Sequence, residues 1–250
     1  MSEKEKYWCG TMHEPVIASV AKQSRKIAWI ASALLLLAMT VFPHFTALAE
    51  DNAPAFLTPA QIAPHQKTID RVTKYLSGLS TIVADFTQVA PDATLTSGKF
   101  FLKRPGRMRW QYNPPTPVLM IANGSEFVYY DYELEQVTYV PLDSALVGFL
   151  AQKTIAFDDK VGIIHFEEEN GAIRISMAQR DKPTEGQLML EFSDKPLFIR
   201  NMVVTDASNQ RTTVALSNAK FGVALDKRLF VFLDPRKGRG QPLGGTVLNQ

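Results

Sequence analysis

Residues 101–110 read FLKRPGRMRW, a stretch that sets four cationic side chains among some of the largest apolar side chains of the chain. Residues 104–107, Arg-Pro-Gly-Arg, fit a type II turn, because proline fixes φ at the second position and glycine supplies the positive φ at the third. A strand after this turn points alternate side chains to opposite faces. One face then carries Met108, Trp110 and Tyr112. The stretch therefore predicts a β-hairpin with one aromatic face.

Further turn signals separate β-rich runs along the chain. Asn123-Gly124 and Asn170-Gly171 are dipeptides that favour two-residue hairpin turns. Residues 193–196 and 207–210 are also rich in turn-forming side chains. We expect an α+β fold in which roughly 9–11 strands form an antiparallel meander and one early helix covers it.

The early helix is expected after two start signals. Thr58 precedes Pro59 and Ala63 precedes Pro64, so each proline stands in a first helical turn, where its missing N–H is not needed. Four apolar residues then recur at helical spacing, namely Ile69, Val72, Leu76 and Leu79. This pattern predicts an amphipathic helix that packs on an apolar surface.

A second, shorter helix is expected at residues 143–152, DSALVGFLAQ, which are apolar nearly all round. A helix of this length is not stable alone in water, and an all-round apolar helix has to be buried. The segment either fills a core or lies across an apolar opening.

Several strand segments carry bulky side chains on both faces, among them residues 118–121 and 129–130. A sheet with one face in water should not show this pattern. One explanation is a sandwich or a helix-covered sheet, with both faces buried as core. The other is a sheet that curves around the helix and keeps an apolar cavity for a ligand on its concave face.

The first 49 residues have the order of a secretory signal peptide. A basic segment precedes the apolar residues 27–42, and Ala47-Leu-Ala49 provides a cleavage site of small residues. The apolar run is shorter than the roughly 20 residues that span a bilayer. We expect a cleaved signal peptide at 1–49, a linker at 50–57, one domain at 58–236 and a loose tail at 237–250.

Charge and cysteine content narrow the function. Five of the 27 Lys and Arg residues and three of the 25 Asp and Glu residues lie in the leader, so the rest of the chain carries 22 of each. This balance does not favour nucleic-acid binding, which needs a positive field. The single cysteine, Cys9, lies before the apolar run. We therefore expect a soluble exported protein without disulfide, thiol chemistry or lipid anchor.

Several short motifs of this sequence, taken in order, resemble those of a known protein family. They are Asp85-Phe-Thr-Gln88, the hairpin at 98–110, Asn123-Gly124 with its aromatic strand, residues 134–137, residues 141–142 and residues 229–236. Their order and spacing resemble the outer-membrane lipoprotein carrier (LolA-type) family of the bacterial periplasm, with residues 229–236 resembling its closing strand.

The resemblance implies an unclosed antiparallel β-barrel with an apolar concave face and helices that close it as a lid. It also implies a soluble periplasmic carrier without cofactors. Such a carrier takes acylated lipoproteins from an inner-membrane ABC transporter and delivers them to an outer-membrane acceptor.

The resemblance assigns site residues of the family to matching positions of this sequence. Arg104 matches the basic residue that bonds to the lid backbone and holds the empty cavity shut, which makes it a lid latch. Met108 and Trp110 match cavity-lining positions, and Phe127 and Tyr129 lie in the matching aromatic strand. Residues 145–151 match a lid helix, with Leu146 and Phe149 as further acyl-cavity residues.

Other functions compete with this interpretation. An enzyme or metal site has little support, because His165 and Glu167 share a strand face without a third ligand. The same fold carrying another lipid is one alternative. A periplasmic regulator that senses lipid and binds an anti-sigma factor is the other.

Overall fold

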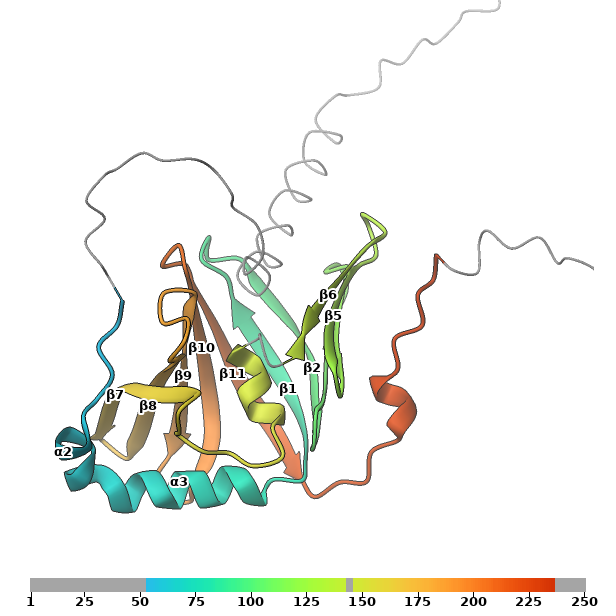
Figure 1. Ribbon diagram of the computed structural model, residues 1–250. Coiled ribbons are helices and arrows are strands. Elements are labelled where there is room, and N and C mark those ends of the chain that lie inside the picture. Colours follow the sequence, from blue (N-terminus) through green and yellow to red (C-terminus); the bar gives the residue numbers. More distant parts are fainter. Residues whose placement is uncertain (1–52, 143–145, 237–250) are drawn as a thin grey trace, which may run out of the picture.

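The computed structural model describes residues 53–142 and 146–236, so the predicted signal peptide, the start of the predicted linker and the predicted tail lie outside the described residues. In the described part, eleven strands form one sheet in the order β6-β5-β4-β3-β2-β1-β11-β10-β9-β8-β7 (Figure 1). They are β1 (Thr81–Val89), β2 (Leu95–Lys103), β3 (Arg107–Tyr112), β4 (Val118–Asn123), β5 (Glu126–Asp131), β6 (Gln136–Pro141), β7 (Val161–Glu169), β8 (Ala172–Gln179), β9 (Gly186–Ser193), β10 (Phe198–Asp206) and β11 (Arg211–Phe221).

Two antiparallel meanders make up this sheet. Strands β1 to β6 follow one another on one side, and β11 back to β7 do so on the other. They meet where β1 pairs with β11, with Phe86 opposite Leu216 and Val89 opposite Thr213. The outermost strands, β6 and β7, rise on either side of an opening (Figure 1). The predicted α+β fold with an unclosed antiparallel barrel is confirmed.

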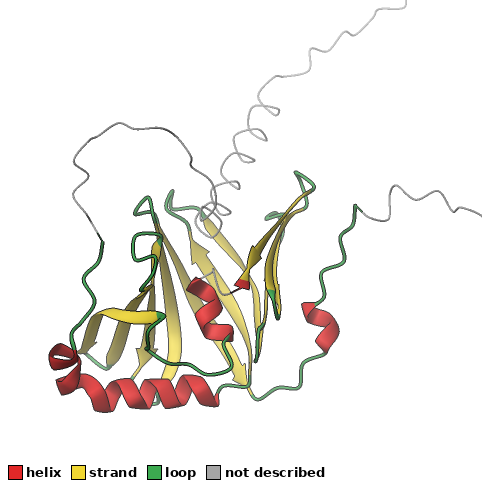
Figure 2. Cartoon of the chain, viewed as in Figure 1, coloured by secondary structure: helices red, strands yellow, loops and turns green. Residues whose placement is uncertain are grey.

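The helical start signals act as predicted. Helix α2 (Pro59–Ile62) begins with a reciprocal cap, in which the N–H of Gln61 donates to Oγ1 of Thr58 (3.4 Å) and the N–H of Thr58 donates to Oε1 of Gln61 (2.9 Å). The 3₁₀ helix η1 (Ala63–His65) leads into α3 (Gln66–Gly78). Figure 2 shows α3 lying along one end of the curved sheet, where it buries Ile69, Val72 and Leu76.

The chain before α2 runs along one edge of the sheet. The N–H of Leu57 donates to the carbonyl of Ile163 in β7 (2.8 Å). Beside it, the ring of Phe56 lies under the guanidinium of Arg180 (4.7 Å). The edge of β7 is thus partly paired before the first helix begins.

The predicted second helix is a 3₁₀ helix, η3 (Leu146–Ala151), and residues 143–145 of the predicted segment lie outside the described residues. It lies across the concave side of the sheet, between the two meanders (Figure 2). Phe149, Leu150 and Ala151 are buried, and Leu146 is half-buried against the core. We refer to η3 as the lid helix.

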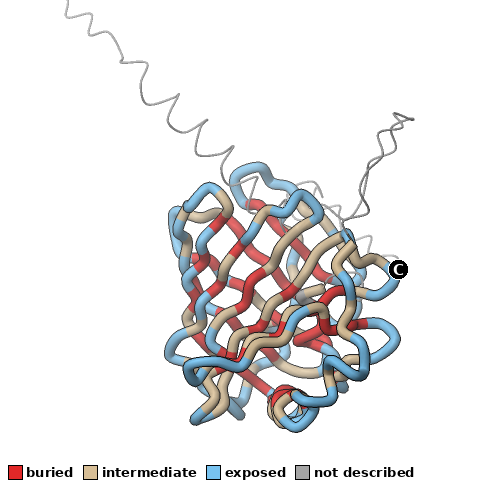
Figure 3. Tube along the Cα trace, turned by 90° about the vertical axis from the view of Figure 1, so that its left-hand side faces the viewer, coloured by how far each residue is buried: buried red, intermediate tan, exposed pale blue. Residues whose placement is uncertain are grey.

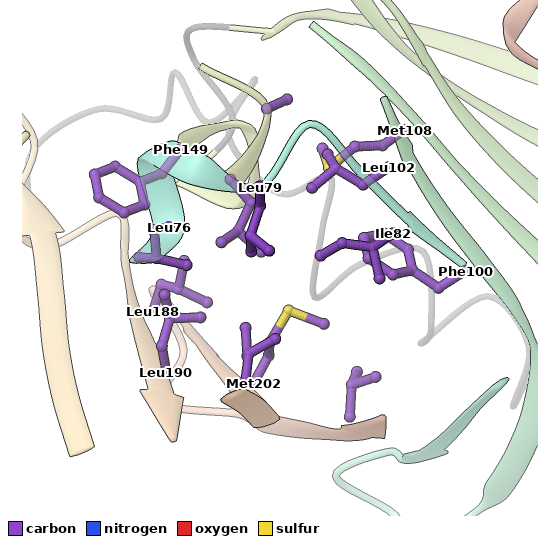
Figure 4. Packing of buried hydrophobic residues seen from close by; sticks show 14 of the residues in the cluster. Leu76, Leu79, Ile82, Phe100, Leu102, Met108, Phe149, Leu188, Leu190 and Met202 are labelled. Atoms are coloured by element: carbon purple, nitrogen blue, oxygen red, sulfur yellow. The ribbon is translucent and has the colours of Figure 1, made fainter. Parts of the chain in front are cut away.

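The concave side holds the main core. Buried and less buried residues alternate along the strands (Figure 3), because a pleated strand sends successive side chains to opposite faces. Figure 4 shows Leu188, Leu190 and Met202 of the second meander pointing toward Leu76 and Leu79. These side chains belong to one continuous apolar cluster that both meanders, α3 and the lid helix share.

The convex side of β3 to β5 is covered by the C-terminal segment. After the 3₁₀ helix η4 (Lys227–Phe230), Phe232 packs on Tyr130 with ring centroids 5.3 Å apart. Leu119 and Ile121 of β4 join the same small cluster. Residues on both faces of β4 and β5 are therefore buried, which explains their two-sided apolar pattern.

The prediction of a closing strand at residues 229–236 is wrong. These residues lie over the face of β3 and β4 and not beside a strand edge. Their backbone therefore does not pair with a strand of the sheet. Side chains hold the segment instead. Nη1 of Arg109 donates to the carbonyl of Leu229 (3.0 Å), and Nζ of Lys103 donates to the carbonyl of Leu225.

The turn at residues 104–106 differs from the predicted type. Lys103 pairs with Arg107, so the loop has three residues, and the peptide bond before Pro105 is cis, whereas a type II turn is built on trans bonds. The positive φ predicted at Gly106 is observed, at 77°.

Gly98 of β2 allows close packing across the sheet, which can be tested by adding a methyl group. Its neighbours Phe86 and Tyr112 approach edge to face with ring centroids 5.0 Å apart. A Cβ at Gly98 would stand 2.1 Å from the carbonyl oxygen of Gln111 and 2.7 Å from Cε1 of Phe86. We expect Gly98→Ala to lower the free energy of unfolding by about 2 kcal/mol in urea titrations.

Gly78→Ala is the matched control. A Cβ at Gly78 would have nothing within 4 Å. The change removes freedom from the unfolded chain, so this variant should be as stable as wild type or more stable by up to about 1 kcal/mol. Equal unfolding midpoints for the two variants would contradict the packing described for Gly98.

Candidate functional site

The concave face is the candidate site, because it gathers the largest apolar surface of the described chain. Its side chains include flexible and aromatic residues from both meanders, such as Met108, Trp110, Leu188 and Met202. Methionine and aromatic side chains adapt to irregular apolar ligands better than rigid branched ones do. The face is therefore suited to hold chains of variable shape.

The structure brings the residues predicted from the sequence to this face. Met108, Trp110, Phe127, Tyr129 and Phe149 are buried members of one apolar cluster, and Leu146 packs against it. Trp110 packs against two aromatic rings, with ring centroids 4.3 Å from Phe100 and 5.1 Å from Phe86.

A narrow cavity lies within the concave face. Its volume is about 20 Å³. That is room for about one water molecule. The lining residues are Gln88, Trp110, Met120, Leu188, Met202, Val204, Thr212 and Val214. The face is thus nearly filled by its own side chains in this conformation.

Sequence reasoning missed most of this lining. Of the predicted residues, only Trp110 is among those that line the cavity. Met120 could have been found, since pairing the strands before and after Asn123-Gly124 places it opposite the predicted residue Tyr129. The residues from β9, β10 and β11 could not, because their position depends on the pairing of β1 with β11.

Arg104 connects the lid helix to α3. Its Nε donates to the carbonyl of Leu150 (2.7 Å), and its Nη1 donates to the carbonyl of Leu76 near the end of α3. From the same turn, the N–H of Gly106 donates to the carbonyl of Ala151 (2.7 Å). Two donors from one turn therefore hold the end of the lid helix.

The Arg104 guanidinium is charged at neutral pH despite its burial. Desolvation lowers its pKa to about 10, which is still well above neutral. Hydrogen bonds from a charged donor are stronger than those between neutral groups. The carbonyls near the end of a helix also carry partial negative charge, which favours a cation there. Both effects stabilise the contact with α3.

Metal binding has no support in the part of the chain that the structure describes. No three His, Cys, Asp or Glu side chains in residues 53–142 and 146–236 are arranged to hold a metal ion. His165 and Glu167 line a polar groove, where Glu167 pairs with Arg174 (3.0 Å). His65 stacks on Phe166, with ring centroids 4.4 Å apart. Within the same residues, no helix has the length and apolar character needed to cross a bilayer.

Comparisons with known proteins agree on one family. Residues 77–233 match the family described as "Outer membrane lipoprotein carrier protein LolA". The chain is 33% identical over 195 residues to the outer-membrane lipoprotein carrier protein of Azotobacter vinelandii, covering 74% of this chain and 92% of that one. It is 29% identical to the proteins of the same name from Methylococcus capsulatus (72% and 88% covered) and Pseudomonas paraeruginosa (68% and 85%).

Replacing Arg104 should loosen the lid helix without unfolding the sheet. Arg104→Met keeps an unbranched apolar stem but removes both hydrogen bonds. We expect the amide of Gly106, which donates to the lid carbonyl of Ala151, to exchange with deuterium about tenfold faster, which corresponds to about 1.4 kcal/mol. Hydrogen exchange followed by NMR would measure this.

Arg109→Met is the control, because Arg109 also donates to a backbone carbonyl but on the convex side. Exchange at Gly106 should stay at the wild-type rate in this variant. If the two substitutions change that rate equally, Arg104 has no specific role in holding the lid helix.

Proposed function

This chain belongs to the outer membrane lipoprotein carrier protein (LolA) family, and from that premise we propose that it is a periplasmic carrier of lipoproteins. In this proposal the acyl chains of the lipoprotein bind in the concave face, and the protein moves them from the inner to the outer membrane. The observation that carries the proposal is a broad apolar face closed by a lid helix that Arg104 and Gly106 hold by its backbone.

The energetics of acyl chains explain why such a carrier is needed. Exposing a chain of about sixteen carbons to water costs on the order of 12 kcal/mol, at about 0.8 kcal/mol per methylene. A lipoprotein does not cross an aqueous compartment at that cost without a partner that buries its chains. The concave face offers aliphatic and aromatic side chains for this purpose, Met108, Trp110, Phe127 and Tyr129 among them.

Loading requires the site to open. The present cavity admits about one water molecule, so acyl chains enter only if side chains and the lid helix move aside. Phe149 and Leu146 of the lid helix then exchange contacts with the core for contacts with the chains. We propose that Arg104 sets the balance between closed and loaded states, because it bonds to Leu76 of α3 and to Leu150 of the lid helix, and movement of the lid helix breaks the second bond.

The proposed partners follow from this cycle. The protein receives acylated lipoproteins from an inner-membrane ABC transporter and passes them to an outer-membrane acceptor. Both transfers exchange one apolar environment for another, so they break no covalent bond. We propose a carrier that acts without catalysis, cofactor or metal, in a family named for carrying lipoproteins.

Native mass spectrometry with lipid extraction, on protein purified from its own periplasm, tests the proposal directly. We expect triacylated lipoprotein bound at one-to-one. A different lipid in the same stoichiometry would favour the alternative in which this fold carries other cargo. Protein without bound lipid that also fails to bind an apolar fluorescent dye would overturn the carrier function.

Trp110 provides a test of where the chains bind. It is the only tryptophan in the described residues and lies beside the cavity. A lipopeptide with brominated acyl chains should quench its fluorescence, because bromine quenches tryptophan at contact distance. The combined variant Trp110→Phe and Tyr139→Trp places the fluorophore at a half-exposed position on β6. Equal quenching in both proteins would contradict binding in the concave face.

A further inference from the structure

Four polar side chains meet on the concave face, where nearly all other side chains are apolar. Gln88, Tyr112, Tyr129 and Thr212 come from β1, β3, β5 and β11, and each is more than nine-tenths buried. We call them the polar cluster. Gln88 and Thr212 line the cavity directly. The hydroxyl of Tyr112 donates to Oε1 of Gln88 (2.8 Å).

Most of the hydrogen-bonding capacity of this cluster is unused within the protein. Nε2 of Gln88, the hydroxyl of Tyr129 and the hydroxyl of Thr212 are buried without a hydrogen-bond partner in the described structure. Buried polar groups in folded proteins are nearly always paired, since an unpaired one lowers stability. Two of these groups, on Gln88 and Thr212, line the cavity, and Tyr129 lies opposite the cavity residue Met120, so the unpaired groups point to a ligand site there.

The chemistry of the free groups defines that ligand. Because Oε1 of Gln88 accepts from Tyr112, the amide of Gln88 presents N–H donors to the cavity. Burial raises the pKa of Tyr112 and that of Tyr129. Both tyrosines therefore stay neutral, and Tyr129 presents a hydroxyl donor. A neutral group that only accepts hydrogen bonds, such as a carbonyl, fits these donors.

The position of the cluster fits the end of an acyl chain. Gln88 lies at the end of β1 that is away from α3, whereas Arg104 binds Ser80 through its backbone N–H at the start of that strand (2.9 Å). Residues 81–88 span about 23 Å of extended strand. One leaflet of a bilayer holds its chains in about 15 Å, half of the roughly 30 Å hydrocarbon core. An acyl chain is thus shorter than this strand, so a chain whose carbonyl lies near Gln88 fits between the polar cluster and Arg104.

We propose that the polar cluster binds the ester carbonyl groups through which acyl chains are attached to the cargo. This inference rests on the proposed carrier function and adds what the carrier recognises besides apolar length. An apolar face alone binds any hydrocarbon chain. Hydrogen-bond donors fixed at one end of that face select chains that begin with a carbonyl group. The same donors would fix how far each chain enters.

The test compares two ligands that differ only in their carbonyl groups. One is a glyceryl-cysteine peptide with two ester-linked sixteen-carbon chains, and the other carries the same chains through ether bonds. Binding is measured by quenching of Trp110 or by calorimetry. We expect wild type to bind the diester roughly fivefold or more tightly than the diether, because each hydrogen bond in a dry site is worth about that factor.

Variants identify the groups responsible. In the double variant Gln88→Met and Thr212→Val, affinity for the diester should fall to that for the diether, while diether binding stays unchanged. Thr212→Val removes an unpaired buried hydroxyl, whereas Gln88→Met also takes away the acceptor of the Tyr112 hydroxyl, so thermal unfolding should occur at or slightly below the wild-type temperature. Thr213→Val, at a half-buried position on the other face of β11, should keep the preference for the diester.

Each result has a distinct meaning. Equal affinity of wild type for the two ligands overturns the polar cluster as a carbonyl site but leaves the carrier function standing. A preference that survives in the double variant overturns the assignment to these residues. Failure of wild type to bind either ligand overturns the carrier function itself. If the double variant binds neither ligand, the variant Tyr129→Phe, which removes one oxygen atom, provides the test instead. Loss of its preference for the diester supports the polar cluster as a carbonyl site, and retention of that preference overturns it.

Discussion

The pairing of β1 with β11 is the contact on which the rest of the structure depends. Each meander alone is a small sheet with one apolar side, and only this pairing turns both apolar sides toward the same space. Its register places Gln88 opposite Val214. A slip by one residue would turn every side chain of one meander to the other face. The core, the cavity and the polar cluster all follow from that register.

The β2–β3 hairpin organises what lies on the two faces of the sheet. Its aromatic side chains form part of the concave face, and its cations hold segments that have no strand partner. Arg104 binds carbonyls of α3 and the lid helix, whereas Lys103 and Arg109 bind carbonyls of the C-terminal segment. Backbone carbonyls outside a ladder still need donors, and long cationic side chains supply them. Arginine is next to tryptophan in the sequence because successive residues of one strand point to opposite faces of the sheet, the apolar ring to the concave face and the cation to the convex face.

Local features of the fold could be predicted from the sequence, and long-range ones could not. Asn170-Gly171 forms its hairpin with positive φ at both residues, because that turn depends only on the two neighbouring residues that form it. The apolar run at residues 229–233 resembles a strand, yet those residues cover a face, since an apolar run does not distinguish a paired strand from a segment that covers a sheet. The role of Gln88 could not be predicted, because its burial and its unpaired Nε2 depend on strands from both meanders.

The hydrogen bonds that hold the lid helix go to its main chain, while its side chains pack into the core. Arg104 and Gly106 bind the carbonyl oxygens of Leu150 and Ala151, groups that every amino acid provides. Substitution of the lid side chains therefore leaves these bonds chemically intact. In the proposed carrier, closure and cargo contact are separated within the same six residues: the backbone serves the first and the inward side chains serve the second. Under that proposal, inward side chains of the lid helix can change, and with them the preferred cargo, while the bonds that close the protein are inherited unchanged.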